Sequence, residues 1–458
     1  MHVVVIGNDQ INDGEGTQLE PSTVVRDADF DGMVLIHEAA AVVHSDVVDY
    51  VARRVGPDVD LVVGAWSYAD ADHGVVQRRG VFSPERLRWS NTVGPVLLVS
   101  GRALRRSGWG TDEHPTMPDL LLRLSELDPT ALVVESTPSV LGHVDDIAAT
   151  ASGLSRAVER HLARVGIDAS VSAGIGPEPS VVVERVVPDD LTVSLVVPTT
   201  GKMSYVRGHS GRLVVNLLDT LFAITDFPSD RLDVVLVIGP EAAPDIGDVV
   251  LERFGPDVVR LVSTSEPFCH SRRTNIGVLA SSADVVVLLN DDTEVMSAGW
   301  LGQIATTATE PGVGLVGPLL RYPDGSIQSA GHAHPHANIS EPMAQVAPSQ
   351  EAAMCRGRDV AGVTLACAAI MRDRYLRAGG LSLRIHNAFN DVDLGMKLEQ
   401  LGLRHVSLGH VAMVHLETAT RAPGVQGFEA AVLEQRWASS MATEHLHFTD
   451  QLHSAVRT

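Results

Sequence analysis

The sequence predicts an α/β protein, with a doubly wound, mostly parallel sheet in its second half and a truncated, degenerate copy of the same fold ahead of it. Three observations lead to this prediction. Short apolar runs alternate with segments of helical spacing, which is typical of parallel sheets covered by helices. Polar or acidic residues follow two of these runs directly, where ligands bind on such sheets. The order of the runs recurs, more weakly, in the first half.

The elements of the second half follow one another at short intervals. Thr192–Val197 is an apolar, β-rich run that stops at Pro198 and Thr199, so it predicts a buried strand and a turn. The next predicted elements are a helix at Leu213–Ile224, strands at Leu232–Ile238 and Val258–Val262, a helix that contains Asn275–Ala280, and a strand at Val285–Leu289.

The first half repeats part of this pattern at a nearly constant offset. The run that begins at Asp31 resembles the run that begins at Asp284, and 284 − 31 is 253. Gly64 and Gly317 follow similar runs, and 317 − 64 is again 253. Chance similarity of apolar strands is the alternative, but an offset held over this length indicates a duplicated fold.

The copy lacks the polar residues of the second half. His37-Glu38-Ala39 stands at the position of Asn290-Asp291-Asp292, and Met117 stands opposite Asp391. His143 is retained opposite His415. Only about 30 residues precede the run at Asp31, whereas about 90 residues of the second half precede the matching run at Asp284. We therefore expect residues 1–150 to form a partial, inactive domain.

The remaining boundaries come from changes in pattern. Ser152–Val165 has helical spacing, and Val171–Val187 is typical of a short hairpin, so residues 151–190 form a predicted connector. The main domain then covers residues 191–423. Residues 424–458 comprise a predicted helix at Phe428–Ala442 and a polar tail.

Composition excludes several classes of function. The net charge is −22 and lysine occurs only at Lys202 and Lys397, which argues against a nucleic-acid partner or an anionic membrane surface. The three cysteines are too scattered for a disulfide framework or a zinc site. The start is strand-like, without the basic region of a signal peptide, and no apolar run is long enough to span a bilayer. We expect a soluble cytoplasmic protein.

Adjacent carboxylates at a strand end are the strongest chemical signal. Asp291 and Asp292 follow the apolar run Val285–Leu289 after a single residue, Asn290. Such groups repel each other unless a cation joins them, and hard oxygen ligands suit Mg²⁺ or Mn²⁺ held together with a phosphate. A solvated turn after the strand is the alternative for these two residues alone.

Three further segments contain candidate site residues. Asp391 and Asp393 open a predicted amphipathic helix; capping explains one of them, and Asp393 fits that structural role better. His415 ends an apolar strand, and its side chain is either a core residue or a metal ligand. The segment Pro267–Gly277 is basic and polar, so Arg272 or Arg273 is a candidate for phosphate and Asn275 for ribose or base; a solvated helix start is the alternative.

Together these segments resemble inverting, nucleotide-sugar-dependent glycosyltransferases of family two, of the GT-A type. The similarity is closest to bacterial enzymes that build cell-surface polysaccharides, including rhamnosyltransferase-like members, and residues 31–187 look like the degenerate half often joined ahead of such a domain. The runs that carry the resemblance are Leu195-Val-Val-Pro-Thr199, Asn275-Ile-Gly277, Leu288-Leu-Asn-Asp-Asp-Thr-Glu-Val295, Gly325-Ser-Ile-Gln-Ser-Ala-Gly331, Asn390-Asp-Val-Asp-Leu394 and His415-Leu-Glu-Thr-Ala-Thr-Arg421.

The resemblance implies a role for each matching residue. Asn290-Asp291-Asp292 occupies the position of the DXD motif, with Asp292 as the metal ligand to the donor diphosphate and Asn290 near ribose or a metal-bound water. His415 matches a second metal ligand for Mn²⁺ or Mg²⁺, Asp391 the catalytic base, and Thr199 a nucleobase contact.

The resemblance also implies the partners. The donor is a nucleotide-diphosphate sugar and the acceptor a glycan or lipid-linked glycan, handled in the cytoplasm or at the inner face of the cell membrane. One departure from the family pattern is that the strand at Leu232–Ile238 ends in Gly239 instead of an aspartate, which leaves the nucleotide undefined.

The segment from Ala333 to Pro348 is long and without periodicity, so it predicts a loop at the acceptor cleft. His332, His334 and His336 alternate at its start, which is a weak signal for metal binding.

Two other functions are compatible with parts of this pattern. A catalytically silent scaffold that binds a glycan or a protein is one, because the first half has lost its site residues. A nucleotidyltransferase is the other, but it requires a glycine-rich, lysine-bearing phosphate loop, and Thr199-Thr200-Gly201-Lys202 is too short for one.

Overall fold

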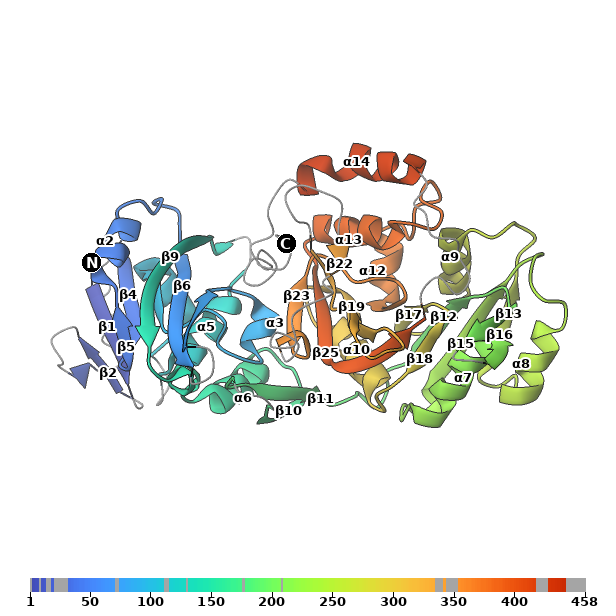
Figure 1. Ribbon diagram of the computed structural model, residues 1–458, viewed down its shortest axis with the longest axis horizontal. Coiled ribbons are helices and arrows are strands. Elements are labelled where there is room, and N and C mark those ends of the chain that lie inside the picture. The colour runs from blue at the N-terminus through green and yellow to red at the C-terminus, as the bar shows by residue number, and fades with distance from the viewer. Residues whose placement is uncertain are drawn as a thin grey trace. The chain divides into compact units, whose positions relative to one another are not determined.

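The computed structural model describes residues 2–7, 10–13, 18–19, 32–70, 74–110, 115–128, 131–174, 178–206, 209–333, 341–342, 353–416 and 427–441. They divide into two compact units, the first ending at Glu184 and the second beginning at Arg185 (Figure 1). Each unit has its own sheet and its own apolar core. Among the residues described in both units, no helix is long and apolar enough to cross a membrane.

The second unit is built on a sheet of ten described strands. In spatial order they are β16 (Val259–Ser263), β15 (Leu232–Ile238), β12 (Val193–Pro198), β17 (Val285–Leu289), β24 (Cys367–Met371), β19 (Val313–Arg321), β25 (Arg404–His415) and β18 (Thr293–Val295), with β20 (Ile327–Ser329) beside β19 and β23 (Gly357–Val360) beside β25. The first four are parallel, whereas β24 and β18 run antiparallel to their neighbours. The predicted α/β fold with a parallel sheet is confirmed, and the other half of the sheet is mixed.

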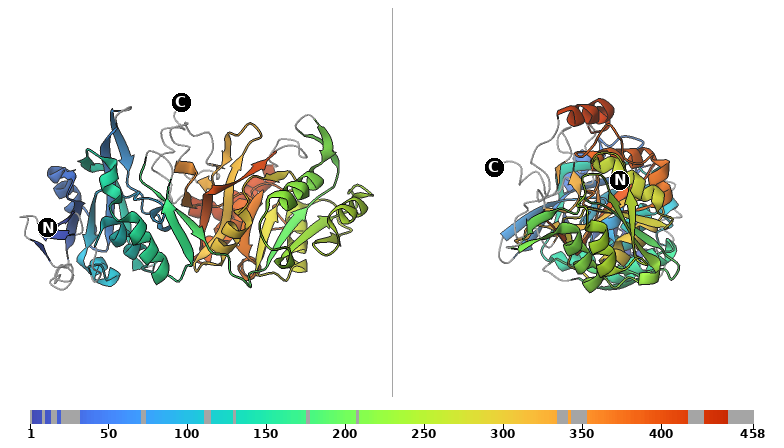
Figure 2. Two further views of the ribbon diagram at one scale, coloured as in Figure 1. Left: turned by 90° about the horizontal axis from the view of Figure 1, so that it is seen from below. Right: turned by 90° about the vertical axis from the view of Figure 1, so that its right-hand side faces the viewer.

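Helices cover both faces of the parallel strands. The helices of this unit are α7 (Leu213–Ile224), α8 (Ile246–Phe254), α9 (His270–Ala280), α10 (Trp300–Thr309), α12 (Arg372–Arg377), α13 (Asn390–Gln400) and α14 (Gly427–Met441), with a 3₁₀ turn at Ser229–Arg231 and short hairpins β13–β14 (Met203–Val206, His209–Arg212) and β21–β22 (His332–Ala333, Glu341–Pro342). Alternate strand residues pack with α7, α8 and α10 in one core. Figure 1 shows α9 on the opposite side from α7, and Figure 2 shows the α7 and α8 side from below (green).

Close packing of α9 explains the glycine in the run Asn275-Ile-Gly277. A Cβ atom at Gly277 would lie 2.3 Å from Cγ1 of Val196, so only glycine lets the helix approach β12 this closely. The start of α9 is thereby held against the parallel strands, near the ends at which ligands bind such sheets.

The first unit contains a second mixed sheet with helices. In spatial order its strands are β3 (Gln18–Leu19), β2 (Gln10–Asp13), β1 (His2–Gly7), β4 (Met33–Glu38), β8 (Val96–Ser100), β6 (Leu61–Asp70), β9 (Val134–Val144) and β5 (Ala41–Val43), with β7 (Gly74–Arg79) beside β6. Its helices are α2 (Ser45–Ala52), α3 (Pro84–Leu87), α4 (Gly101–Ser107), α5 (Met117–Ser125) and α6 (Leu154–Arg164), with a 3₁₀ turn at Ile147–Ala151, and the hairpin β10–β11 (Ala169–Ala173, Val181–Arg185) follows.

The two sheets share one topology. The order β1-β4-β8-β6-β9-β5 matches β12-β17-β24-β19-β25-β18, and each pair of neighbours in one series has the same parallel or antiparallel sense as the corresponding pair in the other. The prediction that the first half repeats the fold of the second is therefore confirmed by strand order and direction.

The backbone register corrects the predicted offset by one residue. Glu38 N donates to Pro95 O as Asn290 N donates to Ala366 O, and 290 − 38 is 252, not 253. Glu38, Ala39 and Ala40 therefore occupy the positions of Asn290, Asp291 and Asp292. Apolar strands resemble one another at neighbouring registers, so the sequence alone could not separate the two offsets.

The same register corrects the prediction that His143 of the first half corresponds to His415. Ala41 pairs with Val144 as Thr293 pairs with His415, so Val144, and not His143, stands at the position of His415.

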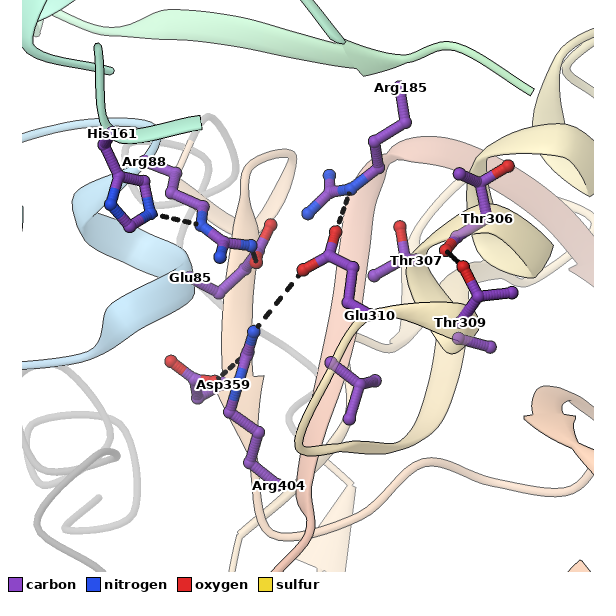
Figure 3. A network of polar contacts seen from close by, with 12 residues as sticks. Glu85, Arg88, His161, Arg185, Thr306, Thr307, Thr309, Glu310, Asp359 and Arg404 are labelled. Atoms are coloured by element: carbon purple, nitrogen blue, oxygen red, sulfur yellow. Dashed lines mark hydrogen bonds and ion pairs between the residues drawn. The ribbon is translucent and has the colours of Figure 1, made fainter. Parts of the chain in front are cut away.

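A network of charged side chains joins separate segments of the second unit (Figure 3). Arg185 Nε donates to Glu310 Oε1 at 2.7 Å, and Arg404 lies 3.7 Å from the other oxygen of Glu310 while it donates to Asp359 at 2.6 Å. Arg404 begins β25, the strand that ends at His415. A separate network in the first unit joins Arg88 to Glu85 and His161.

Candidate functional site

Four element ends bring the predicted site residues into one region of the second unit. Thr199 follows β12, and Asp291 and Asp292 follow β17, its parallel neighbour. His415 ends β25, and Asp391 lies in the first turn of α13. Because β18 pairs antiparallel with β25, Thr293 lies directly opposite His415, which places the histidine beside Asp292.

Asp292 and His415 form the centre of the site. His415 Nε2 lies 3.3 Å from Asp292 Oδ1, and Asp292 is 7% exposed. Oδ1 is buried and has no hydrogen-bond partner among the described residues. A buried carboxylate oxygen without a partner is costly, so this position calls for a proton or a cation.

Gln328 determines which proton His415 carries. Its Nε2 donates to His415 O at 3.3 Å, which fixes the amide orientation, and its Oε1 lies 2.8 Å from His415 Nδ1. Nδ1 therefore carries the hydrogen, and in the neutral ring Nε2 presents a lone pair toward Asp292. An imidazole oriented through its other nitrogen is the usual arrangement of a metal-binding histidine.

The donor set fits a divalent ion that is shared with a substrate. Carboxylate oxygen and imidazole nitrogen are suitable ligands for Mn²⁺, and Mg²⁺ accepts one or two carboxylates together with phosphate oxygens. Across the described residues, no group of three or more His, Cys, Asp or Glu side chains could hold a metal by itself. An ion here would therefore take its further ligands from water or a diphosphate.

Asp291 links the acidic strand end to β12. Thr199 Oγ1 donates to Asp291 Oδ2 at 2.6 Å and accepts from Gly201 N at 2.9 Å. Burial raises the pKa of Asp291 to about 7; the hydrogen bond from Thr199 opposes this shift, and the neighbouring Asp292 carboxylate adds to it. Asp291 is thus held by Thr199, whereas Oδ1 of Asp292 accepts no hydrogen bond from the described residues and faces His415.

The two adjacent arginines at the start of α9 differ in position. Arg273 is fully buried, donates to Thr199 O at 3.1 Å and forms an ion pair with Glu241. Arg272 is partly exposed and lies 3.3 Å from Glu266. Arg273 is therefore the arginine that contacts the strand ends, and the phosphate contact expected of Arg272 stays a prediction.

Asn275 has a structural role that its motif did not reveal. Its Oδ1 accepts from Leu381 N at 2.9 Å and from Tyr375 Oη at 2.5 Å, and its Nδ2 donates to Leu381 O at 2.9 Å. Both lone pairs of Oδ1 are used to position the loop after α12, and the expected contact of Asn275 with ribose or base stays a prediction.

The two aspartates at the start of α13 have different surroundings. Asp393 is fully buried and bonds to Lys397, Trp437 and Arg436. Burial alone would raise the pKa of Asp393, but the hydrogen bonds and charges of these partners outweigh it and lower the pKa. Asp391 is partly exposed, and its Oδ1 accepts only from the backbone N–H of Val392 at 2.9 Å among the contacts described.

His270 connects the two sides of the site. Its Nδ1 accepts from Asn390 Nδ2 at 3.1 Å, so its Nε2 carries the hydrogen that is donated to Asn290 Oδ1 at 3.2 Å. Asn390 directly precedes Asp391, and Asn290 begins the acidic strand end. The sequence reasoning missed His270, although it lies in the polar segment that was singled out.

The loop before α13 is held by the C-terminal helix. Phe389 has a φ of 61°, a left-handed conformation that is unfavourable for an aromatic residue. Glu429 of α14 accepts hydrogen bonds from the backbone N–H groups of His386, Asn387 and Ala388.

Of the candidate segments, Glu417–Arg421, His334 and His336 lie outside the described residues.

Two curated proteins match a large part of the chain. It is 29% identical over 368 residues to the O-antigen biosynthesis protein RfbC of Myxococcus xanthus, which covers 74% of this chain and 27% of that protein. It is 31% identical over 281 residues to an uncharacterized protein, y4gI, of Sinorhizobium fredii, covering 58% of this chain and 29% of that protein. The chain thus spans less than a third of the length of either relative. No family model matches it.

Solved structures also match in part. GalNAc-T7 with UDP, GalNAc and Mn²⁺ has a TM-score of 0.43 at 13% identity, over 54% of this chain and 48% of that chain. The mannosyltransferase PcManGT of Pyrobaculum calidifontis, in complex with GDP-Man and Mn²⁺, has a TM-score of 0.35 at 18% identity, over 59% and 68%. The S. aureus protein TarS has a TM-score of 0.35 at 15% identity, over 49% and 60%.

The resemblance to bacterial proteins of cell-surface polysaccharide biosynthesis, expected from the sequence, is confirmed by the match to the Myxococcus protein.

Proposed function

We propose that the second unit is a metal-dependent, inverting glycosyltransferase that moves a sugar from a nucleotide-diphosphate sugar to a hydroxyl group of its acceptor. One observation carries the proposal: the buried Oδ1 of Asp292, which accepts no hydrogen bond from the described residues, lies 3.3 Å from Nε2 of His415, whose other nitrogen is bound by Gln328. This is the donor set of an ion site that a substrate completes.

Asp292 Oδ1 and His415 Nε2 would hold Mn²⁺ or Mg²⁺. Bound there, the ion acts as a Lewis acid that stabilises the leaving diphosphate, an effect of several kcal/mol. The composition makes this role more important, because the chain has only two lysines and Lys397 is bound to Asp393. The neighbouring Asp291, held by Thr199, shapes the strand end at which the donor binds.

Asp391 is the proposed base. Its Oδ1 is held by the N–H of Val392, so Oδ2 remains to take the proton of the acceptor hydroxyl. The freed oxygen attacks the anomeric carbon as the bond from that carbon to the diphosphate breaks, and attack from the opposite face inverts the configuration. General-base catalysis of this kind supplies roughly 10²–10⁴-fold in rate.

The donor-binding surface is proposed at the ends of β12 and β17. Thr199 and Asn290 lie there, and Arg273 with Glu241 fills the space beside Gly239, where the family pattern has an aspartate. A Cβ atom at Gly239 would lie 2.0 Å from Nη2 of the buried Arg273, so a larger residue there would require this guanidinium to move.

The acceptor is proposed to be a glycan or lipid-linked glycan, handled in the cytoplasm or at the inner face of the membrane. The match to an O-antigen biosynthesis protein supports this class of product.

A panel of nucleotide sugars tests the proposal. The full chain should release nucleoside diphosphate from one UDP-, dTDP- or GDP-sugar in the presence of Mn²⁺, and chelation by EDTA should abolish the release. A catalytically silent scaffold would release none above background with any donor, and metal-independent turnover would remove the proposed ion from the reaction.

A further inference from the structure

His332 is held in a defined position by its backbone. His332 N donates to Gly362 O at 2.8 Å, and Ala361 N donates to His332 O at 3.1 Å. The preceding Gly331 has a φ of 96°, and a Cβ atom there would lie 2.4 Å from Cγ1 of Val360. Only glycine permits this turn and this approach, so the backbone conformation that leads into His332 is well defined.

The side chain of His332 points at the proposed base. Its Nε2 lies 3.8 Å from Asp391 Oδ2, and the residue is 6% exposed. Its Nδ1 is buried without a hydrogen-bond partner in the described part of the chain. Since Asp391 Oδ1 already accepts from Val392 N, the oxygen that faces His332 is the one proposed to take the proton.

We propose that His332 is a positioning residue for Asp391: its Nε2–H is directed at Oδ2 and holds that oxygen toward the acceptor hydroxyl. This inference rests on the proposed function. At 3.8 Å the contact is too long for a hydrogen bond, but hydrogen bonds of catalytic carboxylates often shorten only when substrate is bound. Of the three alternating histidines, His332 is thus assigned to the base.

The charge state of the imidazole supports this role. Burial lowers the pKa of His332, against the opposing effect of the Asp391 carboxylate, so the ring is neutral near neutral pH. A neutral donor orients the carboxylate without locking it in an ion pair, which leaves it basic enough to accept a proton.

The other charged or titratable groups around Asp391 are engaged elsewhere. On its own helix, Asp393 bonds to Lys397 and to Arg436 of α14. From α9, His270 reaches this helix through Asn390. Among the described residues, His332 is the titratable group that lies within ion-pair distance of Asp391, at 3.8 Å.

One short segment therefore serves both halves of the site. Gln328 orients the proposed metal ligand His415, and four residues later His332 faces the proposed base Asp391. The strand β20 and the turn at Gly331 fix the spacing between them.

Three substitutions of His332 test the inference by steady-state kinetics over a pH series. His332→Ala should lower kcat by about 10- to 100-fold, a part of what general-base catalysis supplies, with the donor KM within about twofold. The acidic limb of the pH profile should move to higher pH, because a carboxylate without its donor is protonated more easily. His332→Gln keeps an N–H near the position of Nε2 and should restore most of kcat, whereas His332→Asn places its amide near Nδ1 and should not.

A matched control separates positioning from stability. His405 is equally buried, but both its ring nitrogens are satisfied, by Leu315 N and Gly395 O. His405→Gln should lower the melting temperature without moving the acidic limb. An unmoved limb in every His332 variant, or equal loss in the Gln and Asn variants, overturns the inference alone. An inactive wild-type chain overturns the proposed function and the inference with it.

Discussion

At the residue scale, comparison of the two units distinguishes the aspartate that stabilises a helix from the aspartate proposed to act in the reaction. Asp119 and Asp393 match: each opens a helix and pairs with a basic residue four positions on, Arg123 at 3.0 Å and Lys397 at 2.9 Å. Asp119 and Asp393 are 274 residues apart, and the same offset places Met117 at the position of Asp391. The copy therefore keeps the buried aspartate that holds its helix and has lost the partly exposed one, as expected if only Asp391 serves the reaction.

Replacement of Asp391 tests its role as base. Asp391→Asn removes the basic oxygen with little change in shape, so transfer should fall by about 10²–10⁴-fold. The affinity for the nucleoside diphosphate with Mn²⁺, measured by calorimetry, should stay nearly unchanged. Equal transfer rates in the variant and the wild type would exclude Asp391 as the base.

Replacement of Gln328 tests the orientation of His415. Gln328→Leu should weaken Mn²⁺ binding in the presence of nucleoside diphosphate by about 10- to 100-fold, the usual effect of losing such a partner. Gln303 offers a matched control, because its amide also makes two hydrogen bonds to a single residue, here to the backbone N–H and C=O of Arg185, both at 2.9 Å. If Gln303→Leu weakens the metal equally, the effect is one of stability and not of orientation.

The sequence predicted the groups that carry charge at element ends but not the groups that orient them. Asp292 and His415 were marked by a strand end and a motif. Gln328 and His270 act through the geometry of an amide and of a ring tautomer, which depends on partners distant in sequence. Adjacent residues of a helix differ by about 100° in direction, so the pattern could not decide between Arg272 and Arg273.

At the element scale, α14 holds the loop that leads into the proposed base. Glu429 accepts from three successive backbone N–H groups, and Trp437 and Leu433 pack on α13 in a small apolar core. The strained conformation of Phe389 lies between these contacts and Asp391. Strain of this kind costs on the order of 1–3 kcal/mol and persists only where the surroundings hold it.

Loss of the Glu429 carboxylate should disturb the base more than the donor site. Glu429→Ala leaves three successive backbone N–H groups without their acceptor, so we expect a loss of stability of about 1–3 kcal/mol and a larger fall in kcat than in nucleotide affinity. Glu434→Ala, at an exposed position of the same helix, is the control. If both variants behave alike in kinetics and thermal unfolding, α14 does not position the loop.

Several helices and strands of the second unit were predictable because the apolar residues of each segment follow one clear spacing, either helical or strand-like. The predicted bounds of α7, β15 and β17 agree with the structure. The mixed half of the sheet was not predicted in this detail, since the direction of β24 and β18 depends on pairing between segments distant in sequence.

At the scale of the whole molecule, the chain comprises one fold built twice, with the site residues present in one unit. Glu38, Ala39 and Ala40 replace the acidic strand end, and Val144 replaces His415. Glu38 is 6% exposed, and its Oε1 has no hydrogen-bond partner among the residues described. Burial raises the pKa of Glu38 to about 8.

This raised pKa makes the stability of the first unit depend on pH. Between the unfolded value of about 4.3 and about 8, the folded state keeps a proton that the unfolded chain has released, so stability falls as pH rises. Glu38→Gln should raise the melting temperature at pH 8 by at least a few degrees, since about 1 kcal/mol corresponds to roughly 2–4 °C, and should change it little at pH 4. The exposed Glu135→Gln should change neither; an equal effect of Glu38→Gln at both pH values would contradict the assignment.

The loss of site residues from the first unit predicts one donor site per chain. Calorimetric titration with nucleoside diphosphate and Mn²⁺ should give a stoichiometry of one, which Asp292→Asn should abolish. A stoichiometry of two would show that the first unit binds a donor despite Ala40 and Val144.

The most direct test of the account is the position of the metal. In crystals grown with Mn²⁺ and a nucleoside diphosphate, the anomalous signal of manganese should lie between Asp292 Oδ1 and His415 Nε2, in contact with the diphosphate. A manganese bound elsewhere, or a diphosphate bound in full occupancy with these two side chains still facing each other and no metal between them, would contradict the central claim.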